Sequence, residues 1–190
     1  RSAIQDICRD LEAVNPMNRL IQGDVGSGKT VVASAALFMS HENGFQSALM
    51  APTEVLAQQL FYSLTQLLGA FGVRIGYLAQ AVPPIEKEQI LNALASGVLD
   101  VVVGTHALIE QNIKFHKLGL VIVDEQHKFG VFQRLALKQK ASRVPHFLLM
   151  TATPIPRTLA MTIYGDMEIS VIADKPPGRL PIKTLWLPEA

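Results

Sequence analysis

The sequence predicts an α/β fold in which a parallel β-sheet is covered by helices on both faces. Six short runs rich in Val, Ile, Leu and Met have the composition of buried strands, and helical segments separate them. Near-continuous apolar runs are typical of parallel sheets, whose strands are buried on both sides. Polar residues follow several of these runs, at the positions where open α/β sheets bind ligands. The predicted strands are residues 19–22, 47–51, 73–79, 99–103, 118–123 and 147–150.

Four helices are predicted in chain order from the spacing of apolar residues. The first ends before Pro16, and the second spans residues 30–40 and stops near Asn43 and Gly44. The third begins after Thr53, a suitable N-cap, and the fourth follows Pro84. The expected apolar faces are Ile4, Ile7, Cys8 and Leu11 for the first helix, Val55, Leu56, Gln59, Leu60, Leu64, Leu67 and Leu68 for the third, and Ile85, Ile90, Leu91 and Leu94 for the fourth.

Residues 23–30 fit the phosphate-binding pattern G-x-x-x-x-G-K-[ST] at every fixed position. Glycines at three of these positions would let successive backbone N–H groups converge on an anion. Lys29 would bind the β- and γ-phosphates, and the Thr30 hydroxyl would complete a Mg²⁺ shell. A chance glycine-rich turn is the alternative, but strand, loop and helix follow in the required order. The predicted nucleotide-binding residues are Gly23, Asp24, Val25, Gly26, Ser27, Gly28, Lys29 and Thr30.

Two adjacent carboxylates, Asp124 and Glu125, follow the apolar run 118–123. Beside a phosphate loop, Asp124 would hold Mg²⁺ together with Thr30, and Glu125 would deprotonate the attacking water. The alternative is a solvated turn at the end of a strand. A second carboxylate favours hydrolysis by water over phosphate transfer to a small molecule. Because no Asn-Lys-x-Asp run occurs, the expected nucleotide is ATP. The predicted catalytic residues are Lys29, Asp124 and Glu125.

Composition limits the class of protein. A net charge of +1 gives no overall electrostatic case for nucleic-acid binding, so any such case depends on local sites. The single cysteine, Cys8, agrees with a reducing compartment, which predicts a cytoplasmic location, and it is expected to be a core thiol. No apolar run is long enough to span a bilayer. Charged residues make up 17% and hydrophobic residues 49%, which favours an apolar surface that a neighbouring domain covers.

Several segments resemble the motifs of superfamily 2 helicases and translocases. Residues 124–127 (Asp-Glu-Gln-His) resemble motif II, 51–59 motif Ia, 103–106 motif Ib and 151–160 motif III. The longer segments 22–30, 124–134 and 151–162 are similar to the RecG family of branched-DNA translocases. The resemblance spans nearly the whole chain and implies a RecA-like ATP-binding motor domain. The transcription-repair coupling factors are the nearest alternative, but they typically have Glu where Gln126 stands.

The resemblance also implies roles for individual residues. Thr53, Thr105 and His106 would contact the DNA backbone. Gln126, His127, Thr151 and Thr153 would couple the nucleotide state to movement. The structural alternatives are that Thr53 and Thr105 are only helix N-caps, and that the histidines are packed loop or core residues. Lys128 stands where the family usually has Arg, which keeps the charge and loses the planar guanidinium.

The expected domain organisation is a motor domain over residues 1–174, a linker over 175–181 and the start of a second motor domain over 182–190. Branched double-stranded DNA, a second motor domain and a wedge domain are the expected partners, with no membrane. The adenine-reading motif and the arginine finger are expected outside this chain, so alone it should hydrolyse ATP poorly. An ATPase acting on RNA or a protein complex, and a binding module without catalysis, are the remaining alternatives.

Overall fold

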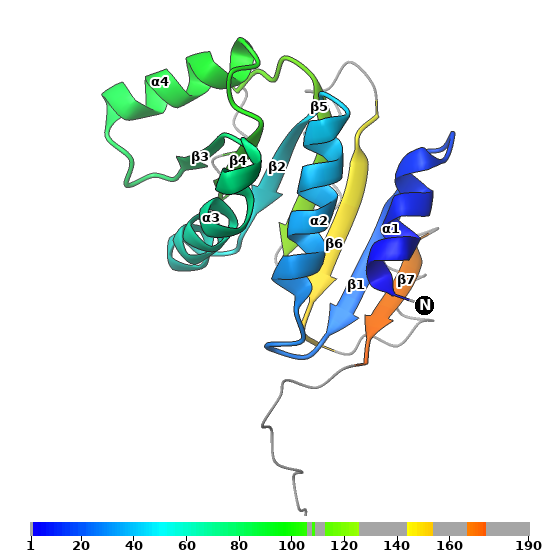
Figure 1. The fold of residues 1–190 in the computed structure, drawn as a ribbon. Coiled ribbons are helices and arrows are strands. Elements are labelled where there is room, and N and C mark those ends of the chain that lie inside the picture. Colours follow the sequence, from blue (N-terminus) through cyan, green and yellow to red (C-terminus); the bar gives the residue numbers. More distant parts are fainter. Residues whose placement is uncertain (1, 106–107, 109–112, 126–143, 154–166, 174–190) are drawn as a thin grey trace, which may run out of the picture.

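The computed structural model describes residues 2–105, 108, 113–125, 144–153 and 167–173, arranged as shown in Figure 1. Seven parallel strands form one sheet in the order β3-β4-β2-β5-β6-β1-β7. The predicted parallel sheet is confirmed, and each of the six predicted strands overlaps an observed one. Their bounds are β1 Asn18–Gly23, β2 Gln46–Met50, β3 Ile75–Leu78, β4 Val101–Gly104, β5 Leu118–Asp124, β6 His146–Thr151 and β7 Glu168–Ile172.

Strand β7 has no counterpart in the sequence prediction. Ile169 and Ile172 pack partly against the two cores, and polar contacts add to this packing. Among the described strands β7 pairs only with β1, at one edge of the sheet, and Ser170 is its one buried residue. The Ser170 hydroxyl accepts a hydrogen bond from the Arg19 guanidinium at 2.7 Å and donates to Asp6 at 2.8 Å. Arg19 also bonds Asp10, so a buried polar cluster joins β7 to β1 and to the first helix.

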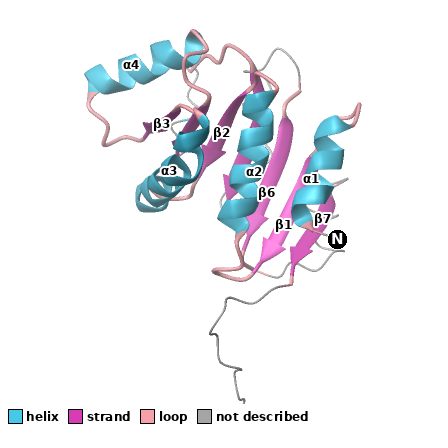
Figure 2. Cartoon of the chain, in the orientation of Figure 1, coloured by secondary structure: helices cyan, strands magenta, loops and turns pink. Residues whose placement is uncertain are grey.

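Helices cover both faces of the sheet, as predicted (Figure 2). The first three pack on one face, against strand residues such as Ile21, Leu49 and Ile122. The fourth packs on the opposite face through Leu94, against alternate strand residues such as Ala48 and Val121. Side chains alternate between the faces of a strand, which is why neighbouring residues belong to different cores. The helices are α1 Ala3–Glu12, α2 Lys29–Glu42, α3 Glu54–Leu68 and α4 Pro84–Ala95. A short 3₁₀ helix, η1 Gly69–Phe71, follows α3.

The helix ends follow the predictions, but two predicted apolar faces are partly wrong. Thr53 caps α3 by accepting a hydrogen bond from the Leu56 N–H, and Asn43 is the C-cap of α2. The buried stripe of α3 is Ala57, Leu60, Leu64 and Leu68. Consecutive residues on a helix point about 100° apart, so Leu67 lies beside this stripe and is exposed. Val55 and Ile85, each in the first turn of its helix, extend beyond the packed region and are exposed as well.

We expect Gly104→Ala to destabilise the sheet around β3 and β4. A Cβ atom at this position would lie 2.2 Å from the Leu78 carbonyl oxygen and 3.1 Å from Leu108 Cγ. The Leu78 oxygen belongs to the neighbouring strand and cannot move without disturbing the ladder, so a cost of about 3 kcal/mol is expected. Hydrogen exchange of the β3 and β4 amides measures it. Gly69→Ala is the control, because a Cβ there has nothing within 4 Å.

A second stability prediction concerns Asp100, a buried carboxylate at the other end of β4. Asp100 accepts hydrogen bonds from Arg74 Nε and Nη2, each at 2.9 Å, and from the Arg74 backbone N–H at 2.8 Å. His41 Nδ1 lies 3.4 Å from Asp100 Oδ1. Burial by itself would raise the pKa of Asp100, but the bonds from Arg74 outweigh it and hold the pKa below its usual value.

A carboxylate with a lowered pKa contributes stability above its unfolded pKa of about 3.9 and loses it as the pH falls through the folded value. Asp100→Asn should therefore destabilise the domain by about 1 kcal/mol near pH 7, since the exposed Arg74 side chain weakens the pair. The difference from the wild type should shrink at about pH 3. Exchange rates of the β3 and β4 amides, compared between the two proteins at each pH, test this; an equal difference at both pH values would contradict it.

Candidate nucleotide site

The predicted phosphate loop joins the end of β1 to the start of α2, at the edge where the parallel strands end (Figure 1). Gly26 and Gly28 have φ angles of 78° and 93°, a region that favours glycine, as predicted. Gly28 is the N-cap of α2, and no side chain caps this helix end. Its first backbone N–H groups therefore remain available for an anion at the positive end of the helix.

Gly23 is required for a different reason from the one predicted. It is the last residue of β1, and it is not among the glycines with positive φ in the described part of the chain. A Cβ atom at this position would lie 2.5 Å from Ser27 Oγ and 3.1 Å from Ile172 Cβ. Close approach of the loop and of β7 thus excludes a side chain at Gly23. At Gly26 and Gly28 glycine is favoured by the positive φ angle instead.

Within the loop, the Lys29 ammonium folds back onto the backbone. Lys29 Nζ donates to the carbonyl oxygens of Gly23 at 2.8 Å and Asp24 at 3.0 Å. The Ser27 N–H donates to the same Asp24 oxygen at 3.1 Å, which closes a tight turn. The buried Ser27 hydroxyl has no hydrogen-bond partner among the described residues. Buried polar groups are rarely left in this state, so a ligand that offers an acceptor here would satisfy this hydroxyl.

Asp124 and Glu125 lie at the end of β5, two strands from the phosphate loop. Burial raises the pKa of Asp124 to about 6; the negative charge of Glu125 adds to this effect, and the Lys29 ammonium opposes it. A divalent cation beside Asp124 would favour its ionised form. An oxygen ligand with this charge suits Mg²⁺, which binds proteins through one or two such groups and takes its other ligands from phosphates and water.

Glu125 has a φ of 49°, the one non-glycine residue with positive φ in the described segments. Strained backbone of this kind persists only where surrounding contacts enforce it. One such contact is a hydrogen bond from the Ala152 N–H to Glu125 Oε1 at 3.1 Å. Glu125 is thereby joined to the predicted coupling segment, where the hydroxyls of Thr151 and Thr153 lie 2.9 Å apart.

Gln22 is a residue of this site that the sequence analysis did not select. Its Nε2 donates to the Thr153 carbonyl oxygen at 3.4 Å, across the ends of β1 and β6. The only sequence signal for it was its position, directly before the loop pattern and at the end of a predicted strand.

The predicted DNA contacts are only partly within the described residues. The Thr53 hydroxyl already caps α3, and Thr105 is buried, with 9% of its surface exposed. His106, Gln126, His127 and Lys128 lie outside the described residues, as do the predicted linker and the start of the second domain. In the described segments no cluster of three or more His, Cys, Asp or Glu residues could hold a metal ion. No helix in these segments is long and apolar enough to cross a bilayer.

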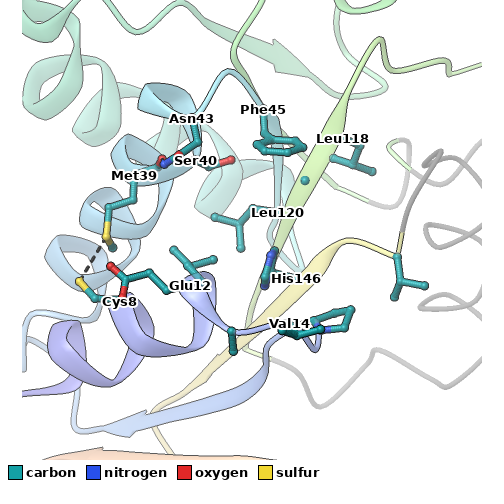
Figure 3. Close-up of a pocket in the computed structure, with 15 residues that line it drawn as sticks. Cys8, Glu12, Val14, Met39, Ser40, Asn43, Phe45, Leu118, Leu120 and His146 are labelled. Carbon is teal, nitrogen blue, oxygen red and sulfur yellow. Dashed lines mark hydrogen bonds between the residues drawn. The ribbon is translucent and has the colours of Figure 1, made fainter.

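A hollow of about 770 Å³ lies on the opposite side from the candidate nucleotide site, where β5 and β6 begin (Figure 3). Leu118, Leu120 and His146 line it, and none of the predicted site residues does. Cys8 also lines it, with its Sγ 3.3 Å from the Met39 sulfur, so this thiol is half-buried and not fully in the core as predicted.

Comparisons with known proteins identify the family. Residues 2–162 match the DEAD/DEAH box helicase family. The chain is 51% identical over 187 residues to the ATP-dependent DNA helicase RecG of Acidithiobacillus ferridurans, and 48% identical over 184 residues to that of Bacillus subtilis. These alignments cover 98% and 97% of this chain but only 27% of each relative. The chain thus corresponds to a minor part of these longer proteins.

Solved structures show the same fold. A structure of RecG bound to a three-way DNA junction has a TM-score of 0.80 and 44% identity, over 95% of this chain and 24% of that one. The helicase domain of Pyrococcus furiosus Hef has a TM-score of 0.67 at 23% identity, over 92% of this chain and 38% of that one, a likeness of fold alone. The predicted RecA-like fold and the resemblance to RecG are confirmed, and the chain belongs to the DEAD/DEAH box helicase family.

Proposed function

We propose that this chain is the first motor domain of an ATP-dependent translocase that remodels branched DNA in recombination and repair. The observation that supports this most directly is that the phosphate loop and Glu125 lie on the same side of the sheet, two strands apart. The Ala152 N–H, at the end of the strand between them, orients the Glu125 carboxylate. The substrate comes from the relatives, which are named ATP-dependent DNA helicases, and from the RecG structure that holds a three-way junction. The proposed location of this protein is the cytoplasm.

In this mechanism, the loop N–H groups and Lys29 bind the phosphates of ATP. Thr30 and Asp124 would hold Mg²⁺, which supplies charge neutralisation at the transferring phosphoryl group. Lys29 leaves its two carbonyl partners in the loop to contact the β- and γ-phosphates. Glu125 accepts the proton of the attacking water, and the Ala152 N–H keeps its carboxylate in one orientation. Hydrolysis therefore depends on the relative positions of the ends of three neighbouring strands, β5, β6 and β1.

Movement requires parts beyond the described residues. A second motor domain would close over the bound ATP and supply an arginine finger, which is worth about 10³ to 10⁵ in rate. Gln126, His127, Thr151 and Thr153 would transmit this closure to the DNA contacts. Thr53, Thr105 and His106 would hold the backbone of the duplex, and a wedge domain of the same protein would hold the branch point. Thr53 can serve both as cap and as contact, because a helix N-terminus attracts phosphate.

The test is ATP hydrolysis by the full-length protein with no nucleic acid, a three-way DNA junction, linear duplex DNA or single-stranded RNA. We expect the junction to stimulate hydrolysis strongly, and more than linear duplex does. Equal rates with and without DNA would reject the translocase function. Stimulation by RNA alone would assign the motor to an RNA-dependent ATPase of the same family.

A further inference from the structure

Two hydrogen bonds end on one short turn after β6, the segment 151–153, and they come from opposite sides. On the β5 side, the Ala152 N–H donates to Glu125 Oε1 at 3.1 Å. On the β1 side, Gln22 Nε2 donates to the Thr153 carbonyl oxygen at 3.4 Å. Strands β5, β6 and β1 are consecutive in the sheet, so the turn is connected to both of its neighbours at the same edge.

The turn has a defined shape of its own. The Thr151 side chain is fully buried, and its hydroxyl accepts a hydrogen bond from the Thr153 N–H at 3.1 Å. This bond closes the turn around Ala152, whose own N–H donates to Glu125 Oε1. Because the turn is closed in this way, a contact on Thr153 also restrains the peptide group that holds Glu125.

On the other side, Gln22 stands one residue before the phosphate loop. It pairs with Thr151 in the parallel register of β1 and β6, which places its amide beside the turn. The next residue, Gly23, is packed too closely against Ser27 and Ile172 to accept a side chain. Close packing therefore restrains the end of β1, where the loop begins, and the Gln22 side chain reaches from there to the turn.

Glu125 needs such support, because its φ of 49° is strained for a residue with a side chain. A relaxed Glu125 backbone would point the carboxylate elsewhere. We infer that Gln22 is a positioning residue for the catalytic base. Gln22 lies on the strand that carries the phosphate loop, and its hydrogen bond restrains the turn that binds Glu125. The base and the γ-phosphate site then keep their relative positions. This inference depends on the proposed function, since it assumes that Glu125 is the base.

The test compares three variants of the full-length protein with saturating junction DNA. Gln22→Met keeps the length of the side chain and removes its donor. Its kcat for ATP hydrolysis should fall about three- to tenfold, the worth of one modest hydrogen bond, with KM for ATP nearly unchanged. Gln22→Lys restores a donor and should recover most of kcat. Gln66→Met, at an exposed position of α3, is the matched control and should behave as the wild type.

A double-mutant cycle tests the route through Glu125. In Glu125→Asp the shortened carboxylate no longer reaches the Ala152 N–H, so adding Gln22→Met should lower kcat by less than twofold more. Full additivity of the two substitutions in kcat would overturn the inference. So would a Gln22→Met protein with a raised KM for ATP, or one that loses thermal stability while its kcat is unchanged. The proposed function fails on a separate result, namely wild-type hydrolysis that the DNA junction does not stimulate. An unaltered kcat in Gln22→Met would reject only the role of Gln22.

Discussion

Replacing Glu125 by Gln in the full-length protein is expected to lower kcat for ATP hydrolysis by about 10²- to 10⁴-fold, the usual contribution of a positioned general base. The amide keeps the size of the carboxylate and can still accept the Ala152 N–H bond, so the local backbone should be preserved. Because Glu125 acts on the water and not on the phosphates, the affinity for ATP should change little. Single-turnover phosphate release and a fluorescent nucleotide titration measure the two quantities.

Glu88→Gln, on the exposed side of α4, provides the control for a loss of negative charge and should retain full activity. A Glu125→Gln protein that hydrolyses ATP within about threefold of the wild type would assign the base to another residue. A variant that also lost ATP affinity would mean that Glu125 supports the phosphate loop itself.

Lys29→Met should impair both binding and catalysis. A charge-assisted hydrogen bond to phosphate is worth about 1.5–3 kcal/mol, which corresponds to an affinity loss of about 10- to 150-fold. Its loss from the transition state should lower kcat by about 10²- to 10³-fold. The empty loop should loosen as well, because Lys29 Nζ bridges the Gly23 and Asp24 carbonyls. Faster hydrogen exchange of residues 23–28 would report this second effect.

Lys114→Met is the matched control, since Lys114 is an exposed lysine on the connection that precedes β5. It should leave nucleotide affinity unchanged. If Lys29→Met bound ATP as tightly as the wild type, the loop would not be the phosphate site, and the motor function would lose its main support.

The candidate nucleotide site was predictable because its residues lie in two short, local patterns. Strand, glycine-rich loop and helix follow each other within residues 19–40, and Asp124 and Glu125 directly follow an apolar strand. In a parallel sheet all strands end on the same side, so these two patterns had to lie on that side. The strand pairings themselves could not be predicted from the sequence, since they depend on which buried faces fit together.

The errors have a common physical origin. Strand β7 contains Glu168 and a buried Ser170, and its place in the sheet is set by parallel pairing with β1, a segment distant in sequence. Val55 and Leu67 have the spacing of a packed face, yet the position of α3 on the sheet leaves them exposed. Each error concerns a residue whose environment is set by a segment distant in sequence.

By itself the sequence determined the fold class, the phosphate loop and the two acidic residues, because backbone conformation and side-chain chemistry over a few adjacent residues are enough to specify them. Only the tertiary structure decided that Gly23 is required by close packing, that Glu125 is strained and held by Ala152, and that Gln22 reaches Thr153. Two of these contacts join strand ends that neighbour one another in the sheet but are distant in the chain: Glu125 and Ala152 are 27 residues apart, and Gln22 and Thr153 are 131 apart. Such contacts exist only once the strand order is set.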